Sequence, residues 1–465
     1  MPRSLVFAVS AIAPLIAACS SPIKDTPSLP PPRVIGVPAG VPLDHPPAGD
    51  TAWTAPLPRQ PDAAALQKRI TVEAAVARVL ANSPELAAAA EAVRAKEGEA
   101  RQASLWLNPE LVGEVENFAG SGEAKDFDTA EYTLSLAQPF DLSGKVRRRA
   151  LAADYERRLA GWEYETIRLD LLTATRKAHA EVTAAQQNVA LARELARLAD
   201  NLADAVRKRV QAGKVSPVEM ARIDVVQTAA RTEALRAAQE LGTARAALVA
   251  LWGEGAAPSE WVTVEDRQAT KVPDPRAVEP LLAQTPEAAR WADELALRET
   301  EFALAQAGAV QDVTASLGVR RFAETDDNAL VAGLSVPLPV FDRNQGAVAA
   351  AAARRVEAER RRSAFRARQK ADFQAAYNTL KAADLSARSL DDRIIPSARS
   401  VFSATTSGYQ AGKFSLIELL DAQRTLFEAQ VQGVAARAEL AKAQADFERL
   451  IAHPADAPAQ PKPGS

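Results

Sequence analysis

Residues 408–424 read Gly408-Tyr-Gln-Ala-Gly-Lys-Phe-Ser-Leu-Ile-Glu-Leu-Leu-Asp-Ala-Gln-Arg424. Glycine is the usual residue just past a helix end, and serine is a preferred N-cap residue. The stretch therefore predicts a helix that ends at Gly412, a very short turn, and a second helix capped by Ser415. An earlier stretch, 210–222, carries the same Gln-Ala-Gly-Lys sequence at the corresponding place. Two copies of one helical hairpin indicate an internal repeat.

The first arm of each hairpin is unusually long. A helical pattern runs from about residue 145 to 212 and again from about 345 to 411. At about 1.5 Å per residue each arm is roughly 100 Å long, whereas the returning helices at 217–251 and 415–451 cover about half that distance. Each long helix is therefore expected to pack against two shorter helices stacked end to end.

Two β-hairpins, at 110–140 and 312–340, precede the long helices. Each strand has one apolar face and one face of small, hydroxyl-bearing or charged residues, which suits a membrane β-barrel with lipid outside and water inside. Hydrocarbon does not tolerate open sheet edges, so four strands must close with those of other chains. Two copies would give about eight strands with a filled interior, and three about twelve with room for a pore. A soluble sheet that covers a helical domain is the alternative.

The N-terminus predicts export and lipidation. Residues 1–18 place a basic residue before an apolar run too short to span a bilayer, as in a signal peptide. The run ends at Cys19, the chain's single cysteine, in a sequence that resembles a bacterial lipobox. Ser20, in place of aspartate, favours the outer membrane; a chance cysteine behind an ordinary signal is the alternative. Residues 19–62 are proline-rich and predict an extended, lipidated linker.

Composition argues against several function classes. The net charge is only −3 with acids and bases well mixed, so no nucleic-acid surface is expected. Three histidines lie scattered in the chain, and no nucleophile motif, phosphate loop or metal-ligand spacing is present. We therefore expect neither an enzyme nor a resident metal or cofactor. A periplasmic adaptor or coiled-coil lipoprotein is the rival class, but an adaptor would have a single helical hairpin flanked by β-rich domains.

The order helix, β-hairpin, long helix, turn, helix, given twice between residues 70 and 451, resembles the TolC family of outer-membrane efflux ducts. That family's hairpin-tip pattern is matched by Tyr409, Gly412, Ser415, Glu418, Leu420 and Ala422. The stretches 138–145 and 336–346 are most similar to the heavy-metal efflux branch, the CzcC-like ducts. Drug or organic-compound efflux and type I secretion are alternatives within the same fold.

The resemblance implies an α+β membrane protein built as a homotrimer in the outer membrane. Its four strands per chain would form a shared barrel of about twelve strands, above a tunnel of antiparallel, coiled-coil helices that reaches into the periplasm. The expected divisions are a first repeat at 70–252 with its helical hairpin at 145–252, a mid-tunnel connector at 253–284, a second repeat at 285–451 with its helical hairpin at 345–451, and a disordered tail at 452–465.

The family's partners are a periplasmic membrane-fusion adaptor and an inner-membrane, proton-driven pump of the RND type. By this resemblance the two hairpin turns dock the adaptor. The docking residues are Gly213, Lys214, Val215, Ser216, Gly412, Lys413, Phe414 and Ser415. The alternative is that these glycines and serines simply cap helices, and both roles are compatible because a tight cap also makes a narrow tip.

In the family, acids after the second turn form constricting rings that act as a periplasmic gate. Glu418 and Asp421 match those positions and share a helix face, so a threefold axis would make each a ring of three acids that favours cations. Glu219 and Tyr409 match two partners of the lock that holds the tip shut. The family's basic lock residue falls at Phe414, so that contact is missing or Lys413 supplies it. Ordinary solvated helix residues are the alternative.

Two basic clusters begin the long helices just beneath the predicted barrel. They are Lys145 with Arg147, Arg148 and Arg149, and Arg354 with Arg355. Contact with the phospholipid head groups of the outer membrane and a local role in helix packing are equally compatible with the sequence.

Overall fold

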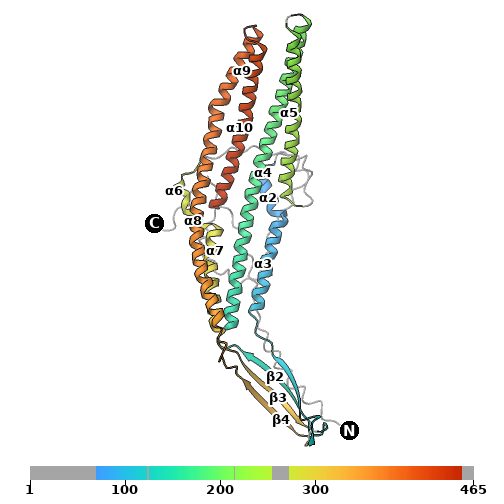
Figure 1. Ribbon diagram of the computed structural model, residues 1–465, viewed down its shortest axis with the longest axis vertical. Helices are drawn as coiled ribbons and strands as arrows, with labels where there is room; N and C mark the ends of the chain where they lie inside the picture. Colours follow the sequence, from blue (N-terminus) through green and yellow to red (C-terminus); the bar gives the residue numbers. More distant parts are fainter. Residues whose placement is uncertain (1–69, 123–124, 214, 254–271, 453–465) are drawn as a thin grey trace.

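The computed structural model describes residues 70–122, 125–213, 215–253 and 272–452. Figure 1 shows an elongated molecule with a β-sheet at one end, two helical hairpin tips at the other, and long helices between them. The predicted signal peptide, Cys19, the proline-rich linker and nearly all of the C-terminal tail lie outside the described residues.

The first repeat has two short helices, a β-hairpin and a long helical hairpin. Its elements are α2 (Val72–Asn82), α3 (Pro84–Ala103), β1 (Glu110–Glu116), β2 (Glu131–Phe140), α4 (Lys145–Gln211) and α5 (Pro217–Ala250). Ser83 separates α2 from α3 because its hydroxyl accepts from the Leu86 amide while Pro84 opens the next helix. The long helix α4 has 67 residues without a break.

The second repeat has the same plan. A short connector of α6 (Pro275–Val278) and the 3₁₀ helix η4 (Glu279–Gln284) precedes it. Its elements are α7 (Pro286–Ala307), β3 (Val313–Phe322), β4 (Asn328–Ser335), α8 (Gln345–Ser389), the π-helical turn η5 (Leu390–Ile394), α9 (Ile395–Gln410) and α10 (Leu416–Ile451).

Two details differ from the pattern in the sequence. The second long arm is not a uniform helix, because the π turn η5 lies just before Pro396, whose missing N–H and bulky ring disturb regular α-helical bonding. The predicted second β-hairpin also extends further than its last strand, because alternate residues stay apolar as far as Leu338. β4 ends at Ser335, since Pro337 and Pro339 cannot donate to a strand partner.

The helices pack as their lengths predict. α4 lies beside α5 towards the tip and beside α3 and α7 towards the sheet, while α10 lies between α4 and the rod formed by α8 and α9 (Figure 1). Two apolar cores form where the shorter helices meet end to end. One lies around Val79, Val182 and Leu248, and the other lies around Phe373 and Phe447.

The four strands form one antiparallel sheet in the order β1-β2-β3-β4, so β1 and β4 are open edges. The register pairs Leu134 with Val319 and Thr133 with Arg320, which separates the two faces cleanly. Large apolar side chains on one face are exposed to solvent in the single chain, among them Leu111 at 71%, Leu317 at 63% and Leu330 at 81%. Among the described helices, none is long and apolar enough to cross a membrane.

Most basic residues of the two clusters contribute to packing where the long helices meet the sheet. Lys145 lies 2.7 Å from Asp312, which joins α4 to the start of β3. Arg149 donates to the carbonyls of Ala103 and Leu105 at 3.0 and 3.1 Å, and so satisfies the end of α3. Arg148 donates to the Ser143 and Gly144 carbonyls, and Arg355 lies 3.1 Å from Glu299. These contacts support the helix-packing interpretation for these four basic residues.

Candidate functional site

The two hairpin tips are tight turns built on glycines. Gly213 and Gly412 have φ angles of 69° and 71°, a left-handed conformation that side chains with a β-carbon seldom adopt. After Gly412, the Lys413 amide donates to the Gly408 carbonyl at 2.8 Å and closes the helix end. The ring of Phe414 packs directly over Gly408, where a β-carbon would overlap it. Lys214 lies outside the described residues.

Both return helices begin with a serine cap, and the second has a reciprocal capping box. The Ser216 hydroxyl accepts from the Val218 amide at 3.2 Å. Ser415 donates its amide and its hydroxyl to Glu418 Oε2 at 2.7 and 2.8 Å, and its Oγ accepts from the Glu418 amide at 3.3 Å. Hydrogen bonds from the Ser415 amide and hydroxyl lower the pKa of the Glu418 carboxyl.

The tips of the two hairpins contact each other through an apolar cluster. Val206 and Ile223 of the first hairpin are fully buried against Leu416 of the second, with Tyr409 packed alongside. The Arg209 guanidinium lies 5.1 Å from the centroid of the Tyr409 ring, a cation–π contact between the hairpins. In the described part of the chain, the buried Tyr409 hydroxyl has no hydrogen-bond partner, so Tyr409 joins the hairpins through its ring.

Those predicted gate and docking residues that the structure describes lie at one end of the molecule. Asp421 is exposed and lies 2.8 Å from Arg424 on the same helix. Glu219 is half-buried in the first turn of α5, and Phe414 is 43% exposed beside Gly408. Sequence reasoning missed Arg209, which supplies a basic group at Tyr409 from the other hairpin. No local pattern distinguishes Arg209 from the other arginines of α4, because only the contact between the two hairpin tips selects it.

Below the tips, ion pairs join α4 to α10. Arg449 lies 2.6 Å from Asp170, and Lys442 lies 2.6 Å from Glu181. These two bridges connect the first and second repeats halfway along the rod, and Arg449 also lies 2.6 Å from Glu287 of α7 within the second repeat.

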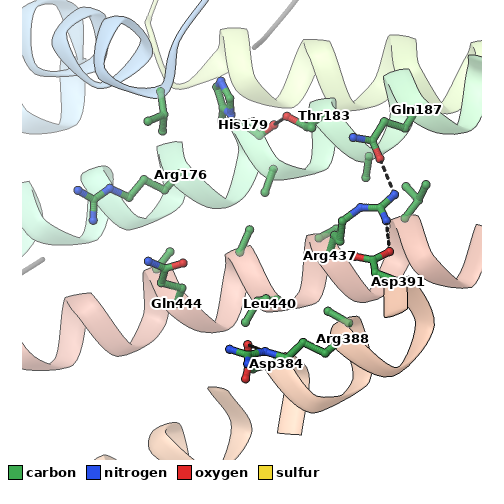
Figure 2. Close-up of a pocket in the computed structure, with 18 of the residues that line it drawn as sticks. Arg176, His179, Thr183, Gln187, Asp384, Arg388, Asp391, Arg437, Leu440 and Gln444 are labelled. Carbon is green, nitrogen blue, oxygen red and sulfur yellow. Dashed lines mark hydrogen bonds and ion pairs between the residues drawn. The ribbon is translucent and has the colours of Figure 1, made fainter. Parts of the chain in front are cut away.

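A pocket of about 490 Å³ lies along the same α4–α10 seam (Figure 2). Most of its charged side chains are already paired: Arg437 donates to Asp391 at 2.6 Å and to Gln187 at 3.1 Å, and Arg388 to Asp384 at 2.9 Å. The Arg437 contacts tie the π turn η5 to α10 and α4. Across the ranges that the structure describes, no group of three or more His, Cys, Asp or Glu side chains is placed to hold a metal ion.

The chain thus combines two helical hairpins, each with a glycine turn at its tip, and a four-stranded sheet with open edges. Residues 75–254 and 278–453 match the family described as outer membrane efflux protein. The chain belongs to this family. It is an outer-membrane efflux channel, and the predicted resemblance to TolC-family, CzcC-like ducts is confirmed.

Curated relatives and solved structures agree with this assignment. The chain is 32% identical over 382 residues to the cobalt-zinc-cadmium resistance protein CzcC of Cupriavidus metallidurans, a match that covers 82% of this chain and 90% of the relative. It is 28% identical over 314 residues to the nickel-cobalt-cadmium resistance protein NccC of Alcaligenes xylosoxydans xylosoxydans, covering 66% and 69%. The outer membrane protein VceC of Vibrio cholerae has a similar fold, with a TM-score of 0.68, 20% identity, and coverage of 82% and 96%. A structure of CusC gives a TM-score of 0.66 at 17% identity, covering 82% and 91%.

Proposed function

We propose that this channel conducts heavy-metal cations out of the cell as the outer-membrane duct of a tripartite efflux system. One observation carries the proposal: three metal-resistance proteins, for cobalt, zinc, cadmium and nickel, are among its relatives, and the CzcC match covers most of both chains. The duct is passive, and selection of the cargo belongs to the pump. The inferred partners are a periplasmic adaptor and an inner-membrane pump of the RND type.

The sheet supports a shared barrel. Each chain leaves β1 and β4 as open edges, and backbone groups at an open edge cannot be satisfied in hydrocarbon. Its exposed apolar face, with Leu134 and Leu330, would meet lipid, and its other face would line the pore. Three chains would supply about twelve strands, enough to leave an aqueous channel. We therefore infer a homotrimer, held at the membrane also by a lipid on Cys19.

The tips support adaptor docking. Gly213 and Gly412 have no heavy atom within 4 Å of the place where a β-carbon would be, so each turn is narrow and open to a partner. The serine caps at Ser216 and Ser415 keep the turns tight, so capping and docking are parts of one arrangement. In a trimer, Glu418 and Asp421 would form two acidic rings close to the docking surface.

The second candidate is export of organic compounds. The chain is 26% identical over 404 residues to the pyoverdine export outer membrane protein OpmQ of Pseudomonas aeruginosa, covering 79% of this chain and 81% of that protein. A growth experiment separates the two. Deletion of the gene should lower the tolerated concentrations of cobalt, zinc, cadmium or nickel ions and raise their cellular content, with recovery on complementation. Unchanged metal tolerance with a lost tolerance of organic toxicants would favour the second candidate.

A further inference from the structure

Arg320 joins three strands of the sheet through its guanidinium group. Its Nε donates to Thr133 Oγ1 at 2.9 Å, and its Nη1 lies 2.7 Å from Glu131 on β2. Its Nη2 lies 2.9 Å from Glu116 on β1. The side chain is 27% exposed, so the group is held in one orientation against the sheet.

The strand register places Arg320 on a strongly acidic face. Arg320 pairs with Thr133, which pairs with Glu114, and the same face carries Glu131 opposite Glu116. The four carboxylates of this face are Glu110, Glu114, Glu116 and Glu131. Within the described strands, Arg320 is its one basic side chain, and no described group pairs with the carboxylates of Glu110 and Glu114.

This face is the one that would line the pore, because the opposite face carries the exposed leucines and valines. Arg320 is two residues from the end of β3 at Phe322, and this end of the strand leads into the hairpin loop of the sheet, far from the helices (Figure 1). In a closed barrel it would therefore stand near the outer mouth. A charge in a narrow pore with low-dielectric walls acts on passing ions more strongly than a charge on an open surface.

We propose that Arg320 sets the charge selectivity of the channel mouth by neutralising part of the acidic strand face. The proposal rests on the proposed function, since it needs this face to line a pore. With Arg320 present, Glu116 and Glu131 are paired, while Glu114 at the same level of the sheet remains to attract cations and Glu110 lies further towards the helices. An acidic mouth favours cations, and the arginine weakens their binding enough to let them leave, as conduction requires.

The neighbouring residue provides a matched control. Arg321 follows directly on β3, so its side chain points to the opposite, apolar face. It is 51% exposed and pairs with Asp326 in the hairpin loop. Substitution of either arginine by glutamine removes one positive charge at nearly the same position along β3. Only the Arg320 change acts on the proposed pore face.

The test measures reversal potentials of the purified, full-length trimer in planar bilayers under a potassium chloride gradient. Arg320→Gln should shift the reversal potential towards that of potassium, and Glu114→Gln should shift it the opposite way. Arg320→Lys keeps the charge and should remain near the wild type. Arg321→Gln should leave the potential unchanged.

Each result decides the proposal. If Arg320→Gln and Glu114→Gln both conduct with the wild-type reversal potential, Arg320 does not set selectivity, although the channel function stands. If Arg320→Gln fails to assemble, an unchanged reversal potential in Glu114→Gln overturns the proposal, because this face then does not act on the pore. Equal shifts from Arg320→Gln and Arg321→Gln would overturn the assignment of this face to the pore. A wild-type protein that forms no conducting channels would instead contradict the proposed function.

Discussion

The guanidinium of Arg209 lies over the ring of Tyr409, 5.1 Å from its centroid, and thereby joins the two helical hairpins at their tips. The contact lies beside the apolar cluster of Val206, Ile223 and Leu416. Closer to the sheet, ion pairs such as Lys442 with Glu181 join the same two repeats. We therefore expect the hairpins to separate at the tip contact while the middle of the rod stays joined.

Loss of the Arg209 contact should loosen the closed tip. Because a cation–π contact contributes about 0.5–1 kcal/mol, Arg209→Ala should raise the open-to-closed ratio of single channels about two- to fivefold. The matched control is Arg207→Ala on the same helix turn, since Arg207 is exposed and pairs only with Asp204 in the described chain. Equal gating in Arg209→Ala and the wild type would show that the stacking does not hold the tip.

A side chain at Gly412 should abolish docking while the trimer still assembles. Gly412→Val forces a β-branched residue into a φ of 71°, at a cost of about 1–2 kcal/mol, and widens the turn. Metal tolerance of a complemented deletion strain and trimer bands on a mild gel are the two measurements. Gly242→Val is the control, because Gly242 lies in α5 with no atom within 4 Å of a β-carbon position. Full tolerance in the Gly412→Val strain would rule out the docking role.

The acidic rings should respond to loss of charge. Glu418→Gln keeps an oxygen acceptor for the capping box, and together with Asp421→Asn it removes the charges of both rings. The double variant should conduct more strongly or lose its block by divalent cations in planar bilayers. Unchanged conductance and unchanged divalent block would contradict the gate assignment. Because the double variant keeps the capping box, a change in conductance would not be due to loss of the cap.

The pH dependence of the block should report the capping box. The pKa of Glu418 is lowered by its hydrogen bonds from Ser415, so the carboxylate keeps its charge as the pH falls through the ordinary glutamate range. In the Asp421→Asn background, divalent block should therefore persist to lower pH than in Ser415→Ala with Asp421→Asn. Loss of block at one common pH in both proteins would show that the Ser415 hydroxyl does not tune this group.

The core around Phe447 should dominate the stability of the second repeat. Phe447 is fully buried and packs against Phe373 and Tyr377, with ring centroids 5.7 and 6.1 Å away. Phe447→Ala should lower the free energy of unfolding by about 3–5 kcal/mol, seen as a lower melting temperature by circular dichroism. Leu385→Ala, at a residue 57% exposed in the single chain, should cost much less. Similar losses for both would contradict this ranking.

Periodicity in the sequence predicted the helices and strands well, because helical and strand patterns are local. The turns at Gly213 and Gly412 were also predictable, since glycine and serine mark helix ends through their own backbone chemistry. The π turn before Pro396 was not, because a proline signals a disturbance of the helix but does not say how the backbone absorbs it. The end of β4 was predicted too late for a related reason. The apolar alternation continues past Pro337 and Pro339, although prolines cannot donate the hydrogen bonds that a strand needs.

The sequence by itself therefore determined the repeat, the two tight tips, the two-faced strands and the resemblance to efflux ducts, all of which depend on neighbouring residues. Only the tertiary structure decided which distant side chains meet. It placed Arg209 on Tyr409, Arg320 between Glu116 and Glu131, and Arg149 on the end of α3. Arginines are frequent in this chain and their local patterns are alike, so their partners depend on helix packing and strand register.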